Sequence, residues 1–167
     1  MKTSLDHGLV AQVPPHVRAL LVATQETLGL LFDAEPTFGP GKASPAHAAR
    51  SHDVNVIVGF TGAVQGQMLL GMTKAEAIRL ASTLLMEELE AWGELTASGI
   101  AEIGNIVAGG CATALHQHGY VVSITVPSVV AGERVEVTWP NLFVLDTSLS
   151  LPDAQVGLAI GVKFVPD

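Results

Sequence analysis

The chain has 167 residues and a mass of 17.3 kDa; 49% of its residues are apolar and only 14% are charged. This length favours one domain with its own hydrophobic core, and the composition excludes global disorder. The 16 acidic residues outnumber the 8 basic ones and give a formal net charge of -8, opposite to what phosphate-backbone binding needs, so nucleic acid is not an expected partner.

The first predicted helix follows the prolines at 14 and 15, because apolar side chains recur at three- and four-residue intervals from Val17 to Leu31. Residues 34–52 then mix Pro, Gly, Ala and Ser without a period, so we expect a long, mobile loop there. We place an N-terminal tail at residues 1–13 and a single domain at residues 14–167.

Two short β-rich runs come next, at residues 53–60 and 65–71. The glycine-containing turn between them predicts a hairpin. Thr73 and Glu76 have the spacing of a capping box, which predicts the start of a second helix. We expect that helix to end between residues 88 and 93.

A third helix is predicted from Glu94, whose charge suits a helix N-terminus, to His118, because Gly119 can adopt the left-handed conformation that ends a helix. Only strand patterns follow, rich in Val, Ile, Thr and aromatic residues: 120–126, 133–139, 142–149 and 155–164. Helices and strands come in runs and do not alternate strictly, which predicts an α+β sandwich.

The third helix is predicted to have two faces of different character. Ser98, Glu102 and Asn105 share one stripe, and Gly109 continues it. The flanks of this stripe are Ala101, Ala108 and Ala112. The opposite face, expected to pack on the sheet, holds Ile100, Ile103, Ile106, Val107, Gly110 and Ala114. An acid and an amide therefore project from a surface otherwise made of small side chains.

Three glycines interrupt this helix, and each costs a helix interior about 1 kcal/mol relative to alanine. Gly104 and Gly110 lie toward the core, where close contact between helix and sheet explains them. Gly109 faces outward, which predicts the approach of an external surface. By spacing alone, Glu102 and Asn105 are better interpreted as ordinary exposed polar residues than as a functional pair.

The third helix and the segment after it resemble the signature of the CheC/CheX/FliY phosphatases, and of the CheX branch in particular. The resemblance rests on Ser98, Glu102, Asn105 and Pro127, which match a pattern of Asp or Ser, Glu, Asn and a later Pro. The gap of 21 residues before Pro127 is one shorter than in the family pattern. The hairpin and second helix are similar to the family too, which implies a CheC/CheX-like sandwich with long helices packed on a mostly antiparallel sheet.

The resemblance implies a phosphatase that acts on the aspartyl phosphate of a CheY-type response regulator. Asn105 would hold the attacking water, because an amide offers both acceptor and donors. Glu102 would pair with the active-site Lys of the regulator. No cofactor of the chain's own is implied, because Mg²⁺ is expected in the partner regulator. The partner-contacting residues would be Ser98, Ala101, Ala108 and Gly109.

The resemblance also implies one site per chain and a homodimer, since residues 74–90 hold no Asn that could form a second site. The expected interface is a sheet edge or the late strands between residues 133 and 164, and the high apolar fraction agrees with a subunit contact. The alternative is a non-catalytic module that docks a regulator or flagellar component through Glu102 and Asn105.

Other chemical signals are weaker. His116 and His118 diverge on a helix, so a metal site is not expected there. Cys111 is the single cysteine, which excludes an internal disulfide and predicts a buried, unreactive thiol. No run reaches about 18 apolar residues and the N-terminus lacks the apolar region of a secretion signal, so we expect no membrane span and a cytoplasmic protein.

Overall fold

The computed structural model describes residues 12–45, 48–49, 52–133 and 135–166, so the expected tail lies almost wholly outside the described residues. Its helices are α2 (Pro15–Phe32), α3 (Lys74–Leu85) and α4 (Glu94–Gln117). Its strands are β1 (Thr37–Phe38), β2 (Lys42–Pro45), β3 (Ala48–Ala49), β4 (Val54–Gly62), β5 (Val64–Met72), β6 (Val122–Ile124), β7 (Ser128–Ala131), β8 (Val137–Thr138), β9 (Phe143–Leu151) and β10 (Ala154–Phe164). The three predicted helices are thereby confirmed.

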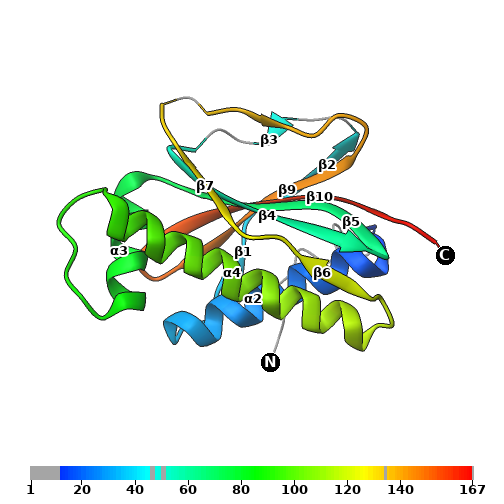
Figure 1. Ribbon diagram of the computed structural model, residues 1–167, viewed down its shortest axis with the longest axis horizontal. Coiled ribbons are helices and arrows are strands. Elements are labelled where there is room, and N and C mark those ends of the chain that lie inside the picture. The colour runs from blue at the N-terminus through cyan, green and yellow to red at the C-terminus, as the bar shows by residue number, and fades with distance from the viewer. Residues whose placement is uncertain (1–11, 46–47, 50–51, 134, 167) are drawn as a thin grey trace.

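Eight strands form one antiparallel sheet in the order β1-β9-β10-β5-β4-β6, with β2 also pairing with β9 and β7 with β4 (Figure 1). The predicted hairpin is confirmed as β4 and β5, which pair from Val54 with Met72 to Phe60 with Gly66. β3 and β8 form a separate pair. Helices on an antiparallel sheet confirm the α+β prediction.

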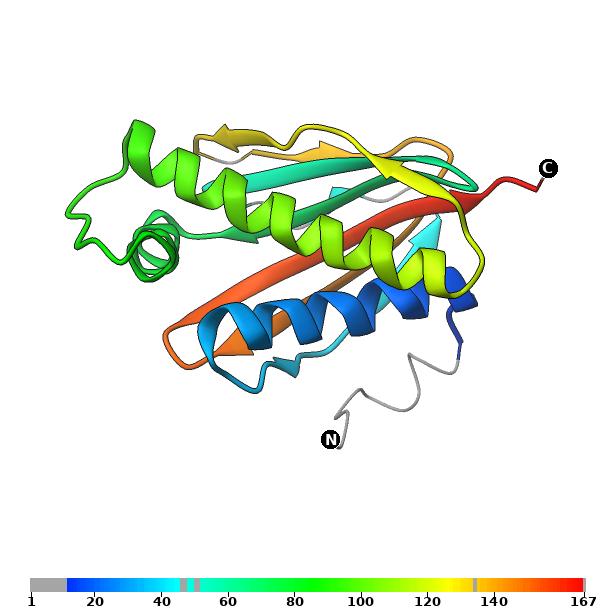
Figure 2. The same ribbon diagram turned by 60° about the horizontal axis from the view of Figure 1, so that its bottom comes forward.

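The helices lie on one face of the sheet, where α2 and α4 run side by side (Figure 2). The alternation along β4 explains this, because Val54, Val56, Val58 and Phe60 point to this face and are buried in one core with α2 and α4. A Cβ at Gly104 of α4 would lie 2.6 Å from Cγ2 of Val56, so this glycine allows the close contact between helix and sheet that we predicted. Within the described part of the chain, no helix is long and apolar enough to cross a membrane.

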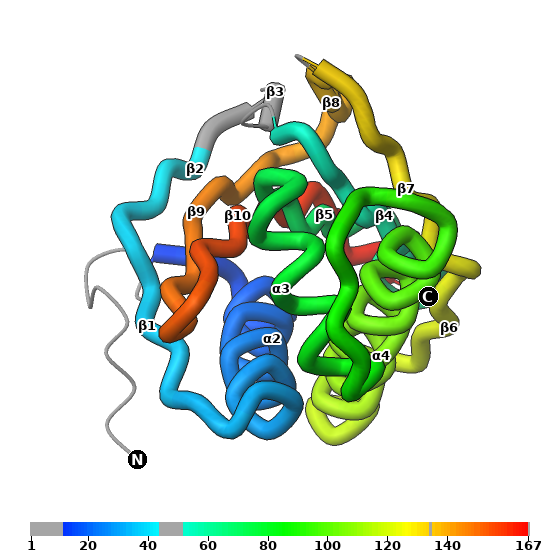
Figure 3. The backbone as a smooth tube through the Cα atoms, turned by 90° about the vertical axis from the view of Figure 1, so that its left-hand side faces the viewer, coloured from blue at the N-terminus to red at the C-terminus, as the bar shows by residue number. Residues whose placement is uncertain are grey.

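On the opposite side of the sheet from the helices, the sheet strands β2 and β7 curve away from the helices, and the segment that carries β8 covers part of this face (Figure 3). Trp139 in this cover is 6% exposed and lies against Gly161 of β10. Its Nε1–H donates a hydrogen bond of 2.6 Å to Oε1 of Gln67. The large indole ring of Trp139 therefore packs on the sheet at a position where the strand has a glycine.

The helix ends follow the predicted signals. Oγ1 of Thr73 accepts a hydrogen bond of 3.2 Å from the N–H of Glu76, and Oε2 of Glu76 accepts one of 2.9 Å from the N–H of Thr73. α3 ends at Leu85, earlier than expected, because Met86 takes a left-handed conformation with φ of 51°. After α4, Gly119 has φ of 86°, as predicted.

Two strand predictions need correction. Residues 34–52 are not one continuous loop, because β1 and β2 pair with β9 and β3 pairs with β8. The backbone hydrogen bonds of these short strands come from pairing with a neighbouring strand. Short strands at the edge of a sheet can therefore form without the alternating pattern of apolar residues by which a strand is predicted from sequence. The predicted strand 133–139 is reduced to β8, whereas β7 forms where none was predicted.

Candidate functional site

The exposed stripe of α4 lies where the sequence placed it. The side chains of Ser98, Glu102 and Asn105 are exposed, whereas Ile103 between them is 1% exposed and packs in the core. Gly109 continues the stripe, and a Cβ built on it would meet nothing within 4 Å. The helix therefore presents an acid and an amide on successive turns, with open space at the next turn.

One residue assigned to this surface was placed wrongly. Ala108 is completely buried in the core, so the prediction that it contacts a partner is incorrect. The cause is α2, which packs beside α4 and brings Thr24 within 3.5 Å of the Cys111 sulfur. The buried face of α4 therefore turns toward α2 and includes Ala108 and Cys111, while Ile106 is only half-buried.

The exposed stripe forms one side of a groove, and the segment that links β6 to β7 forms the other. The groove is lined by Ser98, Ala101, Glu102, Asn105, Ile124, Thr125, Val126 and Pro127. We call residues 124–127 the wall segment. Folding therefore brings Pro127 against the polar pair of α4, although 21 residues separate it from Asn105 in the sequence.

The wall segment was not identified as part of a site from its own composition. Val126 in this segment is 86% exposed, but single exposed apolar residues are common on protein surfaces. The position of Pro127 in the family pattern was the only signal that pointed to this part of the chain.

The acid and the amide of the groove are free to bind an external group. Among the described residues, neither the Glu102 carboxylate nor the Asn105 amide has a hydrogen-bond partner. Glu102 is the only charged residue in the groove lining. The groove can therefore attract one cation through Glu102 and offer both a donor and an acceptor through Asn105.

The two histidines near the end of α4 are engaged within the chain. Nδ1 of His118 lies 2.8 Å from the carbonyl oxygen of Ala114, and Nε2 of His116 lies 3.1 Å from the nitrogen of Val122. Cys111 is fully buried as predicted, and burial raises the pKa of its thiol to about 12. A thiol with a raised pKa is expected to stay protonated at neutral pH, and its lack of reactivity stays a prediction.

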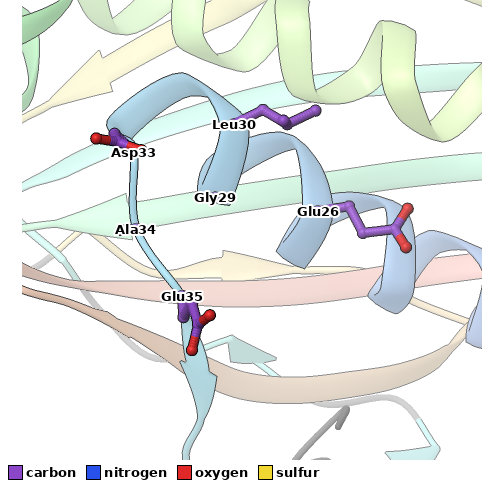
Figure 4. Close-up of a pocket in the computed structure, with 6 residues that line it drawn as sticks. All are labelled: Glu26, Gly29, Leu30, Asp33, Ala34 and Glu35. Carbon is purple, nitrogen blue, oxygen red and sulfur yellow. The ribbon is translucent and has the colours of Figure 1, made fainter. Parts of the chain in front are cut away.

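A second pocket lies at the C-terminal end of α2 and is lined by Glu26, Gly29, Leu30, Asp33, Ala34 and Glu35. Its three carboxylates point in different directions and do not converge on one point (Figure 4). In the described ranges, no three side chains of His, Cys, Asp or Glu are grouped so that they could hold a metal ion. This pocket therefore offers no arrangement comparable to the polar pair on α4.

Comparison with known proteins finds the family described as chemotaxis phosphatase CheX over residues 54–148. The curated CheY-P phosphatase CheX of Thermotoga maritima is 30% identical over 122 residues, which are 72% of this chain and 78% of that protein. Among solved structures, a CheX-CheY-BeF3-Mg²⁺ complex from Borrelia burgdorferi includes a chain with a TM-score of 0.76 and 27% identity, covering 89% of this chain and 97% of that one. A chemotaxis protein CheX from Desulfovibrio desulfuricans has a TM-score of 0.77 at 19% identity, covering 91% and 100%.

Proposed function

The chain belongs to the CheX family of chemotaxis phosphatases, and we propose that it dephosphorylates the aspartyl phosphate of a CheY-type response regulator through Glu102 and Asn105. The observation that carries the proposal is the unpartnered acid and amide on one exposed stripe of α4, opposite the wall segment. The Thermotoga maritima relative is named a CheY-P phosphatase, and the Borrelia burgdorferi structure is a complex with CheY. The names of these two proteins support the proposal that the substrate is a response regulator.

We propose that the chain contributes one positioned water molecule to the reaction. The regulator supplies the other groups, which are its Mg²⁺ and its active-site lysine. The Asn105 amide oxygen accepts a hydrogen bond from the water, while its NH₂ group donates to a phosphoryl oxygen. The water oxygen bonds to phosphorus as the bond to the aspartate oxygen breaks, which releases inorganic phosphate. Glu102 pairs with the regulator's lysine and orients the docked helix.

The small residues beside the pair are part of this proposal. Ser98 and Ala101 line the groove, and Gly109 leaves open space one turn further along α4. Small side chains allow the helix to enter a recessed pocket without steric conflict. We therefore propose Ser98, Ala101 and Gly109 as contacts with the regulator.

The chain is proposed to need no cofactor of its own, because Mg²⁺ is supplied by the regulator's pocket. The presence of Mg²⁺ in the Borrelia burgdorferi complex supports this assignment. We also propose that the protein acts in the cytoplasm, which agrees with a single, buried cysteine that cannot form an internal disulfide.

The proposal is tested by the release of inorganic phosphate from a panel of purified phosphorylated regulators. We expect substoichiometric amounts of the chain to accelerate release from at least one regulator through many turnovers. The alternative docking module would bind a regulator and leave its rate of phosphate release unchanged.

Glu102→Ala is expected to weaken both binding of the regulator and turnover, because it removes the only charge in the groove. A loss of about tenfold in affinity is the expected scale for a hydrogen bond to a charged partner. Titration against a BeF3-activated regulator measures binding, and Glu26→Ala, which removes an exposed acid from α2, is the matched control. Wild-type affinity of the Glu102→Ala protein would contradict the assigned role.

We propose that the protein is a homodimer joined at a sheet edge or through the late strands 133–164. Exposed apolar side chains support this, since Val130 on the edge strand β7 is 41% exposed and Phe143 on β9 is 48% exposed. Sedimentation at micromolar concentration is expected to show twice the chain mass. A single species of 17.3 kDa would contradict the dimer.

A further inference from the structure

The wall segment contains a β-bulge in the edge strand of the sheet, at residues 125–127. β6 pairs with β4 up to Ile124 opposite Phe60, and β7 resumes the pairing at Ser128 opposite Ile57. Three residues, 125–127, therefore stand opposite the two residues 58 and 59 of β4. A bulge bends its strand and redirects side chains, and bulges are over-represented beside active sites.

Thr125 links the two sides of this bulge. Its Oγ1 accepts a hydrogen bond of 2.8 Å from the N–H of Gly59 and lies 3.4 Å from the Val126 carbonyl oxygen, to which the hydroxyl donates. The N–H of Thr125 donates to the Gly59 carbonyl oxygen at 2.9 Å. The Thr125 side chain therefore supplies the hydrogen bond to the Gly59 N–H at the point where the extra residue of the bulge interrupts the regular pairing of the two strands.

Gly59 is the partner that makes this close arrangement possible. A Cβ at this position would lie 2.9 Å from Cγ2 and 3.0 Å from Oγ1 of Thr125. Gly59 is buried, so its N–H would have no solvent to bond to if the threonine hydroxyl were removed. The contact between Gly59 and Thr125 therefore depends both on the absence of a side chain at residue 59 and on the hydrogen bond to the threonine hydroxyl.

The bulge determines which side chains line the groove opposite α4. Val126 is 86% exposed and Pro127 lines the groove beside it. The chain is anchored on one side of them by the contacts of Thr125 with Gly59 and on the other by the pairing of Ser128 with Ile57. Proline adds no N–H that could anchor the segment further. The hydroxyl of Thr125 is thus a side-chain anchor of the wall, in addition to these backbone contacts.

We propose that Thr125 is a positioning residue of the phosphatase site, which holds Val126 and Pro127 as an apolar second contact for the regulator docked on α4. The inference rests on the proposed function and adds to it a specificity surface outside the helix. The part of the regulator that meets Val126 and Pro127 is therefore expected to be apolar, in contrast to the charged group that meets Glu102.

Thr125→Val tests this inference, because valine keeps the β-branched shape and removes the hydroxyl. We expect the KM for the phosphorylated regulator to rise about five- to tenfold, the scale of one lost hydrogen bond, with a smaller change in kcat. Thr125→Ser restores the hydroxyl and is expected to return KM to within about twofold of the wild-type value. Thr83→Val is the matched control, since it removes a hydroxyl that donates to the Arg79 carbonyl oxygen on α3.

Val126→Ala tests the wall directly, because a side chain that is 86% exposed contributes little to folding. We expect a raised KM with an unchanged melting temperature. A wild-type KM in either Thr125→Val or Val126→Ala would overturn the inference and leave the proposed function standing. Unfolding of Thr125→Val would also overturn it, because the hydroxyl would then be structural, and an inactive wild type would overturn both proposals.

Discussion

Asn105→Ala is expected to lower the rate of regulator dephosphorylation by about 10² to 10³, while the affinity for a BeF3-activated regulator stays close to that of the wild type. Loss of one group that acts on the reacting atoms commonly costs about 2.7 to 4 kcal/mol of barrier, which corresponds to this factor. Binding is retained because Glu102 and the wall segment remain. Turnover and titration on the same protein preparation separate the two effects.

Asn105→Asp adds a sharper comparison, because the side chain keeps its shape and loses only the NH₂ donor. A carboxylate at this position places a negative charge next to the phosphoryl oxygens, which disfavours the transition state. We expect the nearly isosteric variant to fail as completely as the alanine variant. Activity of Asn105→Asp near the wild-type level would show that the donor has no role.

Ile103→Asp is expected to unfold the protein or to reduce its melting temperature severely. Ile103 is 1% exposed within the core between α4 and the sheet, so the substitution buries an unpaired carboxylate and removes an apolar contact. The cost is about 4 to 5 kcal/mol, against a total stability of about 5 to 15 kcal/mol for an ordinary domain. Thermal unfolding followed by circular dichroism measures the change.

Glu102→Ala is the matched control for this experiment, because it lies one residue away on the same helix but on the exposed side. We expect its melting temperature to stay within a few degrees of the wild-type value, since exposed substitutions usually change stability by about 0.5 kcal/mol or less. Equal losses in the two variants would mean that α4 is rotated about its axis and that Ile103 does not face the core.

The sequence allowed accurate prediction where the pattern is local. The capping box at Thr73 and the left-handed Gly119 both act within a few residues of a helix end, and both are observed. The exposed positions of Glu102 and Asn105 follow from helical periodicity alone. Their assignment as a functional pair needed the family pattern, because two exposed polar residues are ordinary on any helix.

Apart from the early end of α3 at Leu85, the features that were missed depend on a neighbour distant in sequence. Ala108 is buried because α2 packs on α4, and a helical wheel contains no information about which second element will cover it. The short strand β1 exists because it pairs with β9. The wall segment gains its position from the contact between Thr125 and Gly59, which are 66 residues apart.

The half-life of the phosphoryl group on a CheY-type regulator, measured with no addition, with excess wild-type protein and with excess Asn105→Ala, tests the central claim most directly. We predict a half-life shortened by the wild type and restored almost to that of the regulator alone by the variant. If the wild type leaves the half-life unchanged for every regulator that it binds, or if Asn105→Ala shortens it equally, the catalytic assignment is wrong. In the first case the protein would be a docking module.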